Sequence, residues 1–89
     1  MRTVDSGIRM VVAANTLAPA LAALHAKGFT VSKVEGGAGL LQATKGATVL
    51  HGEDPLDLLG LAAILEMRGA CWQASDAEVD ALLALMGET

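Results

Sequence analysis

The segment from Asp54 to Gly69 constrains the fold of this 89-residue chain more than any other part. It begins with Asp54 and Pro55, a pair typical of a helix N-terminus, because the carboxylate accepts free amide hydrogens and proline has none to leave unpaired. It ends with Arg68 and Gly69. A basic residue suits the negative end of the helix dipole, and glycine readily adopts the left-handed conformation that closes a helix. We therefore predict a helix between these two signals.

The interior of this helix is apolar or glycine at every position from Leu58 to Leu65. A helix with one polar face can lie at a surface, whereas a helix that is apolar all round needs cover on more than one side. That cover must come from a sheet and another helix, or from a second subunit. The run is far shorter than the roughly 20 residues that span a bilayer, so no membrane partner is predicted.

Turn and cap signals divide the chain into seven elements and leave no linker between domains. We predict strands at 8–13, 29–34, 40–44 and 47–51, and helices at 16–27, 54–69 and 75–87. The first helix can be capped by Asn15 or Thr16, and the last by a box of Ser75 and Glu78. The last helix also places four apolar side chains on one stripe: Val79, Leu82, Leu83 and Met86. The order favours a single α+β domain over residues 1–89, a two-layer sandwich with a mostly antiparallel sheet and helices on one face.

The strands at 40–44 and 47–51 would form a hairpin with Lys45 and Gly46 as its two-residue loop. This loop sets Gln42 opposite Val49. It also predicts which side chains share the face toward the central helix: Leu41, Ala43 and Leu50.

The apolar content of 53% consists mostly of small aliphatic residues, and Phe29 and Trp72 are the sole large rings. Trp72 lies between the last two helices and has two interpretations. It could be a lid over the core, which its large apolar area favours, or an exposed anchor for a partner.

The charge balance excludes one class of partner. Ten acidic and six basic residues give a net charge of −4, without a cluster of Lys and Arg. Nucleic-acid binding needs several cations on one face and is not predicted. Cys71 is the sole cysteine, which fits a reducing compartment, and Arg2, Asp5 and Arg9 interrupt the region where a secretory signal would be apolar. We expect a cytoplasmic protein.

Groups capable of catalysis are few. His51 lies two residues before Glu53, close enough for a contact between the imidazole and the carboxylate, but a partly exposed residue at a strand end is the simpler interpretation. One cysteine and two scattered histidines give no zinc spacing. The segment Gly36-Gly37-Ala38-Gly39 precedes no helix, so it does not match a phosphate-binding loop. No catalytic residue, metal or cofactor is predicted.

These observations favour a non-enzymatic interaction protein that associates as a homodimer. The acidic balance suits a basic partner protein, as in an inhibitor or immunity-type protein. The alternative is a small-molecule-binding regulatory domain with its ligand near His51, Gln42 and Glu53.

The C-terminal 40% of the chain carries a further pattern: Glu53-Asp54-Pro55-Leu56, Leu58-Leu59-Gly60-Leu61, Arg68-Gly69, Trp72, and Ser75-Asp76 with Glu78. In these residues the chain resembles small uncharacterised bacterial proteins. The shared residues are helix signals and packing positions, so the resemblance implies a fold and a bacterial origin but no activity.

Overall fold

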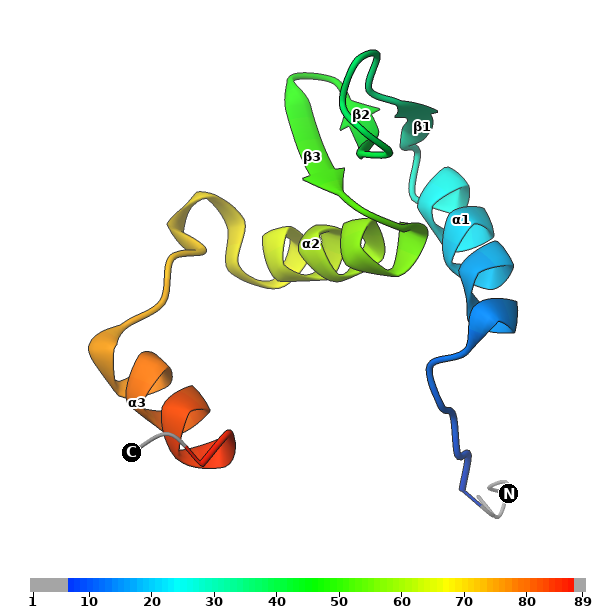
Figure 1. Cartoon of the computed structure of the whole chain (residues 1–89). Helices are drawn as coiled ribbons and strands as arrows, with labels where there is room; N and C mark the ends of the chain where they lie inside the picture. Colours follow the sequence, from blue (N-terminus) through cyan, green and yellow to red (C-terminus); the bar gives the residue numbers. More distant parts are fainter. Residues whose placement is uncertain (1–6, 88–89) are drawn as a thin grey trace, which may run out of the picture.

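In the computed structural model, which describes residues 7–87, two helices lie against a three-stranded antiparallel sheet (Figure 1). Its strands lie side by side in chain order. The elements are the short 3-10 helices η1 (Ala14–Thr16) and η2 (Gly69–Cys71), the helices α1 (Leu17–Ala26), α2 (Pro55–Arg68) and α3 (Asp76–Leu85), and the strands β1 (Thr30–Lys33), β2 (Leu41–Lys45) and β3 (Thr48–Gly52). The predicted α+β sandwich with a mostly antiparallel sheet is confirmed.

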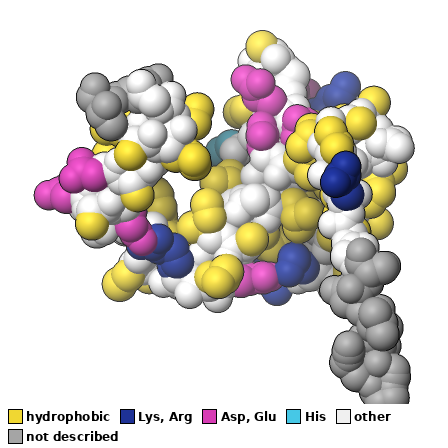
Figure 2. Space-filling view, turned by 90° about the horizontal axis from the view of Figure 1, so that it is seen from below, with side chains coloured by type: hydrophobic (Ala, Val, Ile, Leu, Met, Phe, Trp, Pro, Cys, Tyr) yellow, Lys and Arg dark blue, Asp and Glu magenta, His cyan; other side chains and the backbone are white. Residues whose placement is uncertain are grey.

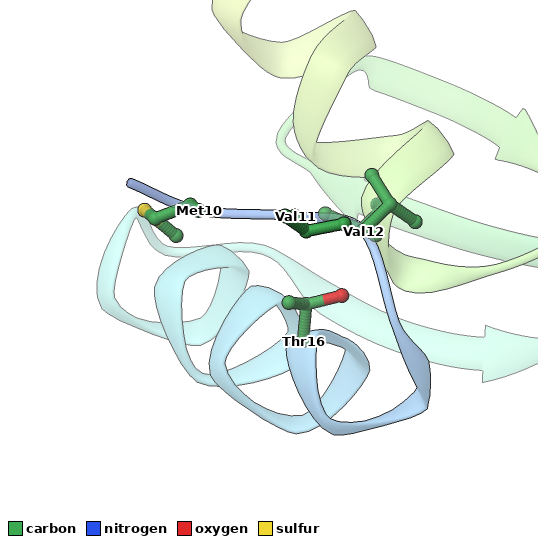
Figure 3. Close-up of a pocket in the computed structure, with 5 residues that line it drawn as sticks. Met10, Val11, Val12 and Thr16 are labelled. Atoms are coloured by element: carbon green, nitrogen blue, oxygen red, sulfur yellow. The ribbon is translucent and has the colours of Figure 1, made fainter. Parts of the chain in front are cut away.

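The predicted strand at 8–13 is wrong. These residues run as an exposed chain across the N-terminal turns of α1 and α2, and Figure 3 shows Met10, Val11 and Val12 beside Thr16. A strand needs a neighbouring backbone to pair with, and the segment does not follow a sheet edge. The Thr16 hydroxyl instead donates to the Ala13 carbonyl at 2.6 Å, which turns the chain into η1 and α1.

The predicted hairpin register is also wrong, by two residues. Gln42 lies opposite His51 rather than Val49, because the loop is Gly46 and Ala47. A two-residue hairpin loop needs a positive φ at its first position, and Gly46 adopts a φ of 59° there. The predicted loop would instead have placed Lys45 at that position, where a positive φ is unfavourable for a residue with a side chain. A shift of two residues keeps every side chain on its face. The predicted inward positions, Leu41, Ala43 and Leu50, accordingly belong to or pack against the core.

The core is small and lies between the sheet and the first two helices. Its buried members are Leu24, Phe29, Ala43, Leu58 and Ala62. The predicted signals of α2 are confirmed: Asp54 accepts the amide hydrogen of Asp57 at 2.9 Å, and Gly69 ends the helix with a φ of 65°. Lys27 and Glu66, 2.8 Å apart, join the end of α1 to α2.

α3 departs from the predicted arrangement, since it does not cover the sheet. It lies apart from the two layers, beyond the end of α2 (Figure 1). Its residues are all exposed, and none belongs to the core. The two-layer body is therefore complete without α3.

Candidate functional site

An open apolar groove lies where the free edge of β3 meets α2. Its volume is about 230 Å³, and it is lined by Val49, Leu50, Leu61, Ile64 and Trp72. Leu50 packs against the core, while each of the other four keeps between 37% and 52% of its surface exposed. The groove thus presents apolar side chains to solvent.

The sequence of α2 creates this groove, because the helix has more apolar faces than the sheet covers. Leu58 and Ala62 are fully buried in the core. Leu61 and Ile64 lie on the same helix, where a turn of about 100° per residue directs them away from that buried face. Met67, near the end of α2, is 86% exposed. The apolar character that predicted a need for additional cover is therefore visible as exposed surface.

α3 carries a second exposed apolar surface. Its predicted stripe consists of Val79, Leu82, Leu83 and Met86, and each keeps at least 38% of its surface exposed. Seen from below, hydrophobic side chains lie over the middle of the molecule and on the flank of the α3 lobe that faces it (Figure 2). An amphipathic helix normally buries such a stripe against a neighbour. Here the stripe has no such neighbour within residues 7–87.

Arg68 and Glu78 connect the end of α2 to the start of α3. The guanidinium donates from Nη1 to Oε2 and from Nη2 to Oε1 of the carboxylate, both at 2.8 Å, and Nη2 also donates to the Gln73 carbonyl at 3.1 Å. Glu78 meanwhile accepts from the Ser75 amide at 2.8 Å, and the Ser75 hydroxyl accepts from the Glu78 amide at 3.2 Å. The predicted capping box is confirmed, and its carboxylate also forms the ion pair that orients α3.

This arrangement changes the titration of both groups. The hydrogen bond from Arg68 is the main cause that lowers the pKa of Glu78 from 4.5 to about 2, and the Ser75 amide adds to it. The same hydrogen bond raises the pKa of Arg68. Both side chains are partly exposed, so solvent and salt weaken their attraction. The pair therefore orients α3 without anchoring it in the core.

Two of the residues singled out in the sequence lie together on the hairpin. Gln42 and His51 are directly opposed on β2 and β3, and His51 Nε2 lies 3.1 Å from Gln42 Oε1. Glu53 follows β3, and its amide donates to the Asp57 carboxylate at 2.9 Å. His51 and Glu53 are exposed, and none of the three lines the groove beside α2.

Trp72 lies elsewhere, at the groove between β3 and α2. It keeps 52% of its surface exposed and does not belong to the core, so the interpretation as a lid is wrong. Its neighbours in the groove, Val49, Leu61 and Ile64, were not singled out from the sequence. The exposure of Leu61 and Ile64 could have been predicted, because α2 is apolar on more faces than one sheet covers. The place of Val49 in the groove could not, because it depends on how the hairpin packs.

A smaller apolar hollow, of about 120 Å³, lies at the opposite end of α2. It is lined by Met10, Val11, Val12, Thr16 and Leu56, so it separates the N-terminal segment from the helix ends (Figure 3). The three valine and methionine side chains are 72% to 79% exposed. The N-terminal segment therefore covers the helix ends only loosely.

Within residues 7–87, no three side chains of His, Cys, Asp or Glu gather where they could hold a metal ion. None of the helices in this range is long and apolar enough to cross a membrane.

Comparison of the chain with protein-family models, with curated proteins and with solved structures finds no match in any of the three. The function is therefore inferred from the geometry of the molecule.

Proposed function

We propose that this protein is a non-enzymatic interaction protein that associates with itself. The observation that carries the proposal is that an entire amphipathic helix, α3, buries none of its residues, while an apolar groove stays open beside α2. Exposing both surfaces to water is unfavourable, and association removes them from water.

The extent of these surfaces supports the proposal. Ten large apolar residues of the groove, the end of α2 and the α3 region are at least 37% exposed: Val49, Leu61, Ile64, Met67, Trp72, Val79, Leu82, Leu83, Leu85 and Met86. At on the order of 100 Å² each, they expose on the order of 1,000 Å². Association that covers these surfaces removes much of this apolar area from water, which is favourable.

A twofold homodimer is the simplest assembly, because closed twofold dimers are the commonest form of soluble self-association. The net charge of −4 favours a basic protein as a further partner, by complementary charge. A cytoplasmic location, the expectation from the cysteine content, completes the proposal.

Sedimentation velocity over a concentration series from below 1 to about 100 micromolar tests self-association, since this series covers association free energies of roughly 5–8 kcal/mol. We expect a dimer that dissociates on dilution. A species of 9.0 kDa at every concentration would contradict the proposal.

A further inference from the structure

We propose that two copies of this chain exchange their last helices, so that the apolar stripe of each α3 lies in the groove of the other copy. This inference rests on the proposed self-association and names its contact. The occupant of the groove is thus α3 of a second copy. A twofold axis relates the two copies, so each dimer contains two identical contacts between a groove and a stripe.

The first step is that the chain carries both halves of one contact. The groove of Val49, Leu61, Ile64 and Trp72 is apolar and open, and the stripe of Val79, Leu82, Leu83 and Met86 is apolar and unburied. An amphipathic helix that lays its apolar face into a hydrophobic groove is a common mode of recognition. Reciprocal exchange covers both surfaces of both copies in one assembly.

The second step is that α3 lies apart from its own groove, at the ion pair beyond the end of α2. Arg68 holds Glu78 at the end of α2, so the Glu78 side of α3 faces that end. The stripe lies about a quarter-turn around the helix from Glu78, so the ion pair leaves the stripe free for another partner. In agreement, the groove contains no residue of α3 from the same chain.

The third step is the size of the contact. A standard stable interface buries about 800 Å² on each partner. The eight exposed apolar residues of the groove and the stripe present on the order of 800 Å², at on the order of 100 Å² each, which matches this requirement. A contact that used the stripe alone, or the groove alone, would fall short of it.

Complementation between two variants tests the exchange. The helix variant carries Leu82→Gln with Leu83→Gln, and the groove variant carries Leu61→Gln with Ile64→Gln. The control carries Ala81→Gln with Ala84→Gln, which places the same two glutamine side chains on the opposite side of α3. Glutamine is uncharged and a good helix former, so the control shows the effect of added polar side chains on α3, and the other two variants add the loss of apolar area from the stripe or the groove.

We expect the control to dimerise like the original chain. Each of the other two variants should dimerise about tenfold more weakly or worse, because two central apolar contacts are lost. An equimolar mixture of the helix and groove variants should recover part of the dimer, since one intact stripe then meets one intact groove. If the mixture is as monomeric as its components while the original chain is a dimer, the exchange is wrong and the proposed self-association stands.

A measurement on the unsubstituted chain guards against variants that fail to fold. Cys71 is exposed, is the sole cysteine and adjoins Trp72, so a short photo-crosslinker attached there reaches the groove. In a mixture of ¹⁵N-labelled and unlabelled protein, we expect crosslinks that join Cys71 of one isotopic form to α3 of the other. Crosslinks confined to one isotopic form would show that α3 folds back on its own chain and would overturn the exchange.

Discussion

Arg68 and Glu78 form an ion pair through two parallel hydrogen bonds of 2.8 Å, and this pair sets the orientation of α3 relative to α2. Two parallel bonds between a guanidinium and a carboxylate fix direction as well as distance, which a single ammonium cannot do. Both side chains stay partly exposed. The molecule thus consists of a two-layer body and a helix whose position depends on one exposed contact.

The first prediction concerns the effect of pH on α3. The folded-state pKa of Glu78, about 2, lies below its ordinary value of 4.5. Above about pH 4.5 the ion pair with Arg68 therefore fully stabilises the position of α3 at the end of α2. That contribution is lost as the pH falls from 4.5 toward 2. We expect the NMR signals of α3 to shift over this interval and the Glu78 carboxyl carbon to titrate near its lower end.

Other carboxylates titrate in the same interval, so the control is Glu78→Gln. This variant should show the altered α3 signals already at neutral pH and lose the corresponding part of the acid transition. A Glu78 carboxyl that titrates at 4.5 would contradict the ion pair in solution.

The second prediction separates α3 from the body. Arg68→Ala removes the ion pair and the hydrogen bond to the Gln73 carbonyl, so amide hydrogen exchange in the first turn of α3 should accelerate several-fold. Exchange in β2 and in α1 should stay unchanged, because neither contacts the pair.

The matched control is Lys27→Ala, which removes an ion pair of the same 2.8 Å length within the body. It should accelerate exchange at the end of α1 and leave α3 unaffected. Equal effects of both variants on the whole chain would show that α3 and the body unfold as one unit.

The third prediction compares two leucines of α2. Leu58 is fully buried, and Leu61 is 37% exposed in the groove. Leu58→Ala should lower the free energy of unfolding by about 2–5 kcal/mol, because it leaves a cavity in a small core. In dilute, monomeric protein, Leu61→Ala should cost under about 1 kcal/mol, since much of that side chain already contacts water. Equilibrium denaturation in urea measures both values, and similar losses would show that Leu61 belongs to the core.

Local signals made much of this fold predictable. Asp54, Gly69 and Ser75 act on backbone groups within four residues, so their roles as helix caps could be inferred from sequence neighbours alone. The inward-facing residues of the hairpin were also predictable, since they depend on alternation along a strand. The two-residue error in register left this alternation intact.

The features that sequence reasoning missed depend on contacts between distant parts of the chain. Residues 8–13 have the composition of a strand, but no sequence rule states whether a sheet edge is available to them. Arg68 and Glu78 were assigned separately to a helix end and a capping box, and their pairing depends on the angle between two helices. Among the residues that line the groove, the sequence pointed to Trp72 alone, because its large side chain is evident without a structure. Val49 lies beside it only because of how the hairpin packs against α2.

The last prediction concerns two glycines that differ in the space around them. Gly60 lies in the interior of α2, and a Cβ there would meet nothing within 4 Å. Alanine restricts the unfolded chain and favours the helix, so Gly60→Ala should stabilise the protein by about 0.5–1 kcal/mol. For a domain of this size, that corresponds to a rise in melting temperature of roughly 2–8 °C.

Gly52→Ala should have the opposite effect. At the end of β3, a Cβ would lie 2.7 Å from the Cβ of Asp57, too close for the two to coexist without movement. Asp57 accepts the Glu53 amide in the turn that starts α2, so its displacement should also weaken this turn. We expect a loss of about 1–3 kcal/mol, the usual cost of overpacking. Thermal unfolding of the two variants under identical conditions measures the difference, and a stabilised Gly52→Ala protein would contradict the close approach of β3 and α2.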